Sequence, residues 1–145
     1  MKLSPIKNSL LMVLAIVFAM HQISGFADPD QDTPSVVLSK VPSLSCGPGG
    51  TGELKGKASG LPSSKDYRIV IYSKCEGVYY VQPTAVSYLT DIDDDGSFAA
   101  DVHGAQEYVA LLVKDGYKSE AQLDQLPKPG GKVIARSKAK RPEKP

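Results

Sequence analysis

Short runs of β-branched and aromatic residues alternate with turn residues over most of the chain after residue 50. The clearest runs are YRIVIYS (67–73), VYYVQP (78–83) and EYVALLVKDGY (107–117). Weaker runs cover 51–58, 85–90, 97–102 and 132–138, and one helical turn is expected within 119–126. No segment has the apolar stripe of a three-turn amphipathic helix. The pattern predicts an all-β fold, a single immunoglobulin- or fibronectin-III-like β-sandwich of about seven antiparallel strands.

Alternation along these runs predicts which side chains face the core. Ile69 and Ile71 share one face of their strand, and Arg68, Val70 and Tyr72 share the other. Because the second face carries a charge, Ile69 and Ile71 are expected to point inward. The run 107–114 is apolar on both faces, as in a strand central to its sheet.

The first 27 residues have the layout of a secretory signal peptide. Lys2 and Lys7 precede an apolar run over 10–20, and small residues end at Ala27, where we expect cleavage. The run is shorter than the roughly 20 residues that span a bilayer, although an uncleaved anchor is the alternative. No cysteine directly follows it, so no lipid attachment site is expected. We expect a secreted, periplasmic or cell-envelope protein with a flexible arm over 28–44, a sandwich domain over 45–137 and a basic disordered tail over 138–145.

Charge is unevenly distributed along the exported part. Residues 28–127 hold 8 Lys and Arg against 15 Asp and Glu, a balance of −7, whereas residues 128–145 hold 7 against one, a balance of +6. A solvated basic tail is the simplest interpretation. The alternatives are that the tail docks on the acidic body or binds anionic polymers.

The exported part contains two cysteines, Cys46 and Cys75. Two cysteines in an oxidising compartment most often pair, although two free thiols are the alternative. If 51–58 and 67–73 formed a hairpin around Pro62, Cys75 would lie near Gly50 and close to Cys46. Such a disulfide should stabilise the fold by about 3–4 kcal/mol.

An acidic segment, DIDDDGSF (91–98), matches the first half of an EF-hand loop. Its carboxylates are Asp91, Asp93 and Asp95, but the bidentate Glu required at the twelfth position is Val102 here. A hairpin turn with Gly96 at positive φ is the favoured interpretation, and weak Ca²⁺ binding is the alternative. The glycine-rich segment 47–53 lacks the lysine of a phosphate-binding loop, since Glu53 stands in its place.

Candidates for catalysis are few. His103 is the one histidine after residue 27 and is expected in a turn, so it would be the sole imidazole base. No zinc-ligand set is present in the exported sequence. The carboxylate pairs Asp66 with Asp101, or Glu76 with Glu107, stay open as glycosidase-like arrangements. We therefore predict no catalytic residues, no cofactor and no nucleic-acid partner.

Tyrosine is the aromatic residue that stands out, with seven against three Phe and no Trp. Tyr79 and Tyr80 are adjacent on a predicted strand, so one of them should face away from the core. With Gln82 and Tyr88 they are the predicted ligand-binding residues, because a tyrosine ring offers an apolar face to sugar C–H groups and a hydroxyl at its rim. The alternative is that these rings are half-buried at sheet edges.

The middle of the chain resembles a secreted bacterial immunoglobulin-like β-sandwich module that is often appended to glycoside hydrolases and polysaccharide lyases. The resemblance covers about 52–136. It is carried by YRIVIY (67–72), the double aromatic Tyr79-Tyr80, Pro83-Thr84, the DGSF turn (95–98) and LLV with GY (111–113 and 116–117). The chain departs from the module's pattern where two Trp are replaced by Tyr79 and Tyr80, and where Gln82 replaces the Lys before Pro83. The resemblance implies a carbohydrate- or envelope-associated role.

These observations predict a non-catalytic, monomeric binding module that contacts glycan or cell-envelope polymer. The alternative is a protein-interaction or inhibitor-like sandwich, and the third possibility is a glycan-active enzyme.

Overall fold

The structure, a computed structural model, describes residues 33–84 and 86–143. The predicted signal peptide, its cleavage point after Ala27 and the first residues of the predicted arm lie outside the described residues. Within the described part, no helix has the length and apolar character needed to cross a membrane.

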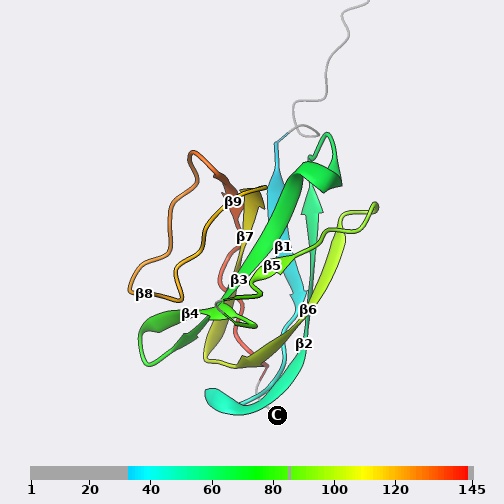
Figure 1. Cartoon of the computed structure of the whole chain (residues 1–145). Helices are drawn as coiled ribbons and strands as arrows, with labels where there is room; N and C mark the ends of the chain where they lie inside the picture. The colour runs from blue at the N-terminus through cyan, green and yellow to red at the C-terminus, as the bar shows by residue number, and fades with distance from the viewer. Residues whose placement is uncertain (1–32, 85, 144–145) are drawn as a thin grey trace, which may run out of the picture.

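Nine antiparallel strands form two sheets in the described part of the chain (Figure 1). The smaller sheet has the order β1-β2-β6 and consists of β1 (Ser35–Lys40), β2 (Gly47–Ser59) and β6 (Ser97–Gly104). The larger sheet has the order β8-β4-β3-β7-β9, with β5 also pairing with β3. Its strands are β3 (Tyr67–Cys75), β4 (Val78–Gln82), β5 (Leu89–Thr90), β7 (Glu107–Lys114), β8 (Gln122–Leu123) and β9 (Val133–Arg136).

The all-β sandwich predicted from the sequence is confirmed. Seven strands have four or more residues, and β5 and β8 have two each. In immunoglobulin-type domains the A, B, E and D strands form one sheet and the C, F and G strands form the other. Here β1, β2 and β6 correspond to A, B and E, and β3, β7 and β9 correspond to C, F and G; in the described part of the chain the smaller sheet has three strands, without a counterpart of D.

The predicted hairpin between 51–58 and 67–73 is wrong. β2 pairs with β1 and β6, whereas β3 pairs with β4, β5 and β7, so the two strands lie in different sheets. The 3-10 turn η1 (Ser64–Asp66) leads the chain into β3. The physical reason lies in the side chains: β2 exposes Lys55 and Lys57 and can bury only one face, whereas β3 is buried on both faces from Ile69 to Tyr72.

The core between the sheets is formed by one face of each. Leu54, Phe98 and Val102 of the smaller sheet pack against Ile69, Ile71 and other buried residues of the larger one. Gly56 is required where β2 passes the Phe98 ring, because a Cβ there would overlap the ring atoms. The inward orientation predicted for Ile69 and Ile71 is therefore confirmed.

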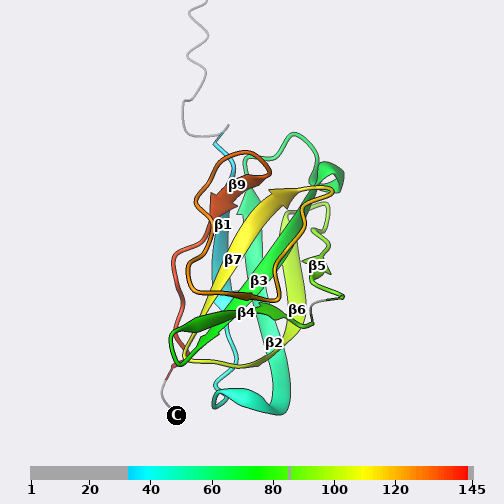
Figure 2. The same cartoon turned by 60° about the vertical axis from the view of Figure 1, so that its left-hand side comes forward.

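The other face of the larger sheet is also buried. The apolar faces of 107–114 indicate this for β7, whereas the face of β3 that carries Arg68, Val70 and Tyr72 was expected to point outward. A long crossing over 115–132, which includes β8, runs over it (Figure 2). Tyr72 is fully buried beneath this crossing, and its hydroxyl lies 3.3 Å from Ser119 Oγ and 3.2 Å from the Glu120 carbonyl oxygen. The remaining residues of this outer cluster include Val70, Val81, Val109, Leu111, Val113 and Val133.

Several predicted local structures differ from those observed. The helical turn expected within 119–126 is absent, and β8 pairs there with β4 instead. Of the strand expected over 85–90, the described residues 86–90 form a strand only at β5. His103 lies within β6 rather than in a turn.

Both ends of the described chain make contacts with the sandwich. The arm expected over 28–44 contains β1, whose Val36 is buried in the core, so the sandwich begins at Ser35. The tail expected to be disordered lies on the domain as far as residue 143. The backbones of Lys140 and Tyr108 exchange two hydrogen bonds of 2.9 Å, and the Ser43 hydroxyl donates to the Glu143 carbonyl oxygen. β7 extends beyond the end of β9, so its unpaired backbone groups are available to this segment.

A buried tyrosine links the two sheets at the connection between β6 and β7. Tyr108 is fully buried near the start of β7, and its hydroxyl donates to the His103 carbonyl oxygen at 2.8 Å. This is the tyrosine-corner arrangement of immunoglobulin-type sandwiches. Burial raises the pKa of Tyr108 to about 12, and burial likewise raises the pKa of Tyr117 to about 12.

The raised pKa values of Tyr108 and Tyr117 predict that the protein loses stability at alkaline pH. Below pH 10 each phenol is protonated in both the folded and the unfolded state, so its contribution to stability is fully present. Between pH 10 and about 12 the phenols of the unfolded chain ionise while those of the folded chain stay protonated, so the free energy of unfolding falls. Tyr108→Phe should cost about 1 kcal/mol at neutral pH through loss of its hydrogen bond. It should also lose less stability than the wild type over the alkaline range, as measured by urea unfolding. An equal alkaline loss in both proteins would contradict a role for Tyr108 in this dependence.

Candidate functional site

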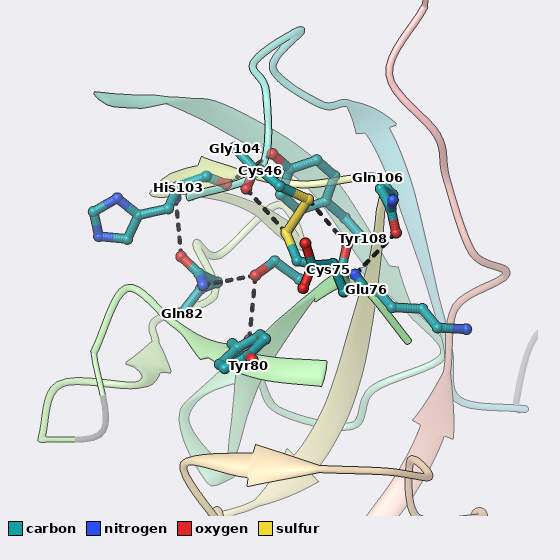
Figure 3. The surroundings of a disulfide bond; sticks show 11 residues. Cys46, Cys75, Glu76, Tyr80, Gln82, His103, Gly104, Gln106 and Tyr108 are labelled. Carbon is teal, nitrogen blue, oxygen red and sulfur yellow. Dashed lines mark hydrogen bonds between the residues drawn. A yellow bond between two sulfur atoms is a disulfide. The ribbon is translucent and has the colours of Figure 1, made fainter. Parts of the chain in front are cut away.

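A cleft of about 460 Å³ lies at the end of the sandwich where the disulfide links the two sheets (Figure 3). Three chain segments form its walls: 46–48 before and at the start of β2, the β3–β4 hairpin, and the end of β6. The lining includes Pro48, Ser73, Glu76, Tyr80, Val81, Gln82, Pro83 and His103. The site therefore combines residues of both sheets.

The disulfide between Cys46 and Cys75 is present, as predicted, although the hairpin used to predict it is not. Cys46 precedes β2 of the smaller sheet and Cys75 ends β3 of the larger one, with a Cα–Cα distance of 5.8 Å. The Cys75 sulfur also lies 3.6 Å from the Gly104 carbonyl oxygen. The bond thus joins the two sheets instead of closing one hairpin.

Gln82 is a second link between the sheets. Its side chain is buried, Nε2 donates to Ser73 Oγ at 2.7 Å, and Oε1 accepts from the His103 backbone N–H at 2.9 Å (Figure 3). Gln82 is one of the predicted ligand-binding residues. In the structure its oxygen and an amide N–H are used within the protein, so its role here is to fix β4 against β6.

Tyr80 is the exposed aromatic residue of this cleft. It lies on the same face of β4 as Gln82, two residues away, and 36% of its surface is exposed. Its carbonyl oxygen lies 3.5 Å from the Ser73 hydroxyl, which adds a contact between its backbone and β3. The ring therefore stands on a well-packed strand with its side chain open to solvent.

Tyr79 and Tyr88 lie on the opposite face of the larger sheet from Tyr80. Both pack against the outer cluster under the crossing. The Tyr79 hydroxyl donates to Glu107 Oε1 at 3.0 Å, and the Tyr88 hydroxyl donates to the Tyr117 carbonyl oxygen at 3.2 Å. The four predicted ligand residues are thus divided into two pairs, and the structure brings only Tyr80 and Gln82 together.

The polar groups at the rim of the cleft are Glu76 and His103. The Glu76 backbone N–H donates to Gln106 Oε1 at 3.2 Å, and Glu76 adopts a positive φ of 50° in the tight turn between β3 and β4. The His103 ring points away from the disulfide, and its Nδ1 lies 3.3 Å from the Gly50 carbonyl oxygen (Figure 3). Ser73 Oγ is bonded to Gln82 instead of to this ring, so Ser73 and His103 do not form a nucleophile–base pair here.

The carboxylate pairs considered from the sequence lie in different surroundings. Glu107 is largely buried beside Lys74, Arg141 and the Tyr79 hydroxyl, with its oxygens 3.7 and 3.8 Å from the two cations. Glu76, its possible partner, is exposed in the β3–β4 turn. Asp66 belongs to η1 before β3, whereas Asp101 lies in β6 opposite Glu53 of the smaller sheet.

The acidic segment before β6 forms a turn, as predicted, but not the predicted hairpin, because β5 pairs with β3 and β6 pairs with β2. Gly96 has a φ of 84°, and its N–H donates to the Asp93 carbonyl oxygen. Asp95 Oδ1 accepts from the Ser97 backbone N–H at 2.8 Å, and the Ser97 hydroxyl lies 2.6 Å from the same oxygen and 3.1 Å from Asp93 Oδ2. The hydrogen bonds from the Ser97 side chain and backbone lower the pKa of Asp95.

The third carboxylate of the predicted calcium set, Asp91, lies 3.1 Å from the Arg68 guanidinium. Asp91, Asp93 and Asp95 therefore each have a protein partner. Over residues 33–84 and 86–143, no group of three or more His, Cys, Asp or Glu side chains could hold a metal ion.

No protein-family model matches the chain, and no curated protein matches it significantly.

The two hydrogen bonds of the Gln82 side chain predict that removing this side chain lowers the stability of the protein. Gln82→Ala leaves the Ser73 hydroxyl and the His103 N–H without their partner, so the free energy of unfolding should fall by about 2 kcal/mol in urea titrations. Gln106→Ala is the matched control, because its amide binds an exposed turn, and it should change stability by no more than about 0.5 kcal/mol. Equal effects of the two substitutions would show that Gln82 does not link the sheets.

Proposed function

We propose that the protein is an exported, non-catalytic binding module that recognises glycan or cell-envelope polymer through the cleft at the disulfide end. The signal-peptide layout, the disulfide and the resemblance of 52–136 to a carbohydrate-associated module support an extracytoplasmic role. The cleft supplies a place for the ligand.

The observation that carries the proposal is the exposed Tyr80 ring on a fixed support. Tyrosine rings stack on the C–H faces of sugars and donate a hydrogen bond at their rim. Behind the ring, the Gln82 bridge and the disulfide hold both sheets in place. A binding surface that is already ordered loses little conformational entropy when it meets its ligand.

The other cleft groups fit the same class of ligand. Pro48 and Pro83 provide apolar surface near the ring, and Glu76 and His103 provide polar groups at the rim. Apolar walls with a few polar groups are typical of small-ligand and sugar sites. Catalysis receives less support, because the Ser73 hydroxyl and the His103 ring are not in contact and Glu107 is engaged by two cations.

A protein-interaction role is the second candidate, and β1 favours it. β1 is an edge strand of the smaller sheet, and Val37 on it is 57% exposed. An edge strand offers backbone groups for pairing with a partner strand.

Retention on insoluble polysaccharide tests the proposal. The purified exported protein should be retained on at least one of cellulose, chitin, xylan and peptidoglycan. Tyr80→Ala should weaken that retention roughly tenfold, since loss of one central aromatic contact costs about 1–2 kcal/mol of binding. Depletion assays over a range of polymer concentrations measure the change.

A control makes the result specific. Val37→Ala removes an exposed apolar side chain from the smaller sheet and should not alter retention. Retention that is insensitive to Tyr80→Ala would exclude this cleft. Capture of one stoichiometric protein partner without polysaccharide retention would favour the second candidate.

A further inference from the structure

A second groove lies on the outer face of the larger sheet, on the opposite side of β4 from the Tyr80 cleft. Its volume is about 700 Å³. Lys74, Tyr79 and Val109 form its floor, the crossing forms one wall through 124–128, and the segment 136–139 forms the other. The adjacent residues Tyr79 and Tyr80 therefore line two different sites.

The groove is rich in positive charge. Its cations are Lys74, Lys128, Arg136 and Lys138, and its one lining carboxylate is Asp124. Lys74 pairs with Glu107. Over the described ranges 33–84 and 86–143, no carboxylate lies within ion-pair distance of the other three cations. An unneutralised excess of positive charge in one groove attracts anions.

β7 holds the backbone segment that carries Arg136 and Lys138. Ser137, between Arg136 and Lys138, is buried; its N–H donates to the Ala110 carbonyl oxygen and its hydroxyl accepts from the Ala110 N–H, each at 2.9 Å. Residues two apart on an extended segment lie on the same side. The side chains of Arg136 and Lys138 are both exposed, and both line the groove.

The carboxylate of Glu107, next to the groove, is already paired with two cations. Glu107 has a side chain that is only 13% exposed, and it contacts Lys74, Arg141 and the Tyr79 hydroxyl. Lys74 also lies over the Tyr79 ring, 4.9 Å from its centroid. Glu107 therefore holds the floor together instead of offering a charge to a ligand.

We infer that this groove is a binding site for an anionic polysaccharide, whose carboxylate or sulfate groups pair with Lys128, Arg136 and Lys138. Cations on opposite walls suit a polymer that carries repeated negative groups. The apolar atoms of Val109, Leu126 and Ala139 between them suit sugar C–H groups. Single-stranded nucleic acid requires several open aromatic rings for base stacking, and the one ring in this groove is covered by Lys74.

This site is independent of the Tyr80 cleft, so the inference holds whether or not the cleft binds glycan. It assigns a role to the basic end of the sequence, because three of the four cations come from residues 128–138. The ordered position of this segment against β7 makes it part of a built surface.

Binding of the purified exported protein to soluble polymers tests the inference. Affinity electrophoresis with polygalacturonate, dextran sulfate and neutral dextran should show retardation by one or both anionic polymers, decreasing with salt, and none by dextran. The two anionic polymers distinguish carboxylate from sulfate as the preferred group.

The decisive variant replaces Lys128, Arg136 and Lys138 with Gln. All three side chains are exposed, so the circular dichroism spectrum should not change, and affinity for the anionic polymer should fall tenfold or more. The matched control replaces Lys40, Lys55 and Lys57 of the smaller sheet, which removes the same charge elsewhere and should reduce affinity less than threefold. Tyr80→Ala should leave this binding unchanged.

Three results would overturn the inference. Equal losses in both triple variants would show that only net charge matters. Equal retardation by neutral dextran would show that the anionic groups are not recognised. Salt-sensitive dimerisation lost in the groove variant, without polymer binding, would assign the groove to the acidic turn of a second copy.

Discussion

The larger sheet is buried on both faces, and most other features of the molecule depend on this. β3 and β7 carry apolar side chains on both sides, so one face packs on the smaller sheet and the other needs the crossing over 115–132 as a cover. Tyr72 fixes that cover through its hydroxyl. Because side chains alternate along a strand, the same arrangement sends Tyr79 and Tyr80 to opposite faces of β4 and separates the two sites.

The disulfide and Gln82 act together at one end of the sandwich. The first joins the residue before β2 to the end of β3, and the second joins β4 to β6. Tyr108 adds a third link nearby, at the connection from β6 to β7. Sheets joined at three points near one cleft cannot slide there without breaking the disulfide or a hydrogen bond, so the support of the Tyr80 ring is in place before any ligand arrives.

Local features of this fold could be predicted from the sequence, and features that depend on distant segments could not. The runs 67–73, 78–83 and 107–114 show their strands through β-branched and aromatic residues, and Gly96 shows its turn. β1 was missed because its apolar run, Val36 to Leu38, is short and lies between Pro34 and Pro42 in a segment otherwise rich in polar and turn residues. The disulfide was predicted correctly through a hairpin that does not exist, because two cysteines have only each other to pair with.

For the cleft and the groove, too, the sequence predicts local features but not those that depend on distant segments. Alternation alone places Tyr79 and Tyr80 on opposite faces, whereas the burial of Gln82 depends on His103, 21 residues away. The groove joins Lys74 of β3 to cations beyond residue 127, and only their proximity in the fold reveals it. The positive charge of residues 128–145 was a signal for this groove. Because residues 138–145 were expected to be disordered, the sequence alone did not show that these cations lie close together.

The central claim is that the cleft at the disulfide end is the glycan site and that it is distinct from the outer face behind β4. The most direct measurement is an NMR titration of the isotope-labelled protein with a soluble oligosaccharide of a retained polymer. We predict that the largest amide shifts fall on Glu76, Tyr80, His103 and Gly104. The largest shifts on Leu126 and Ser137, on the turn over 93–97, or on no defined surface would contradict the claim.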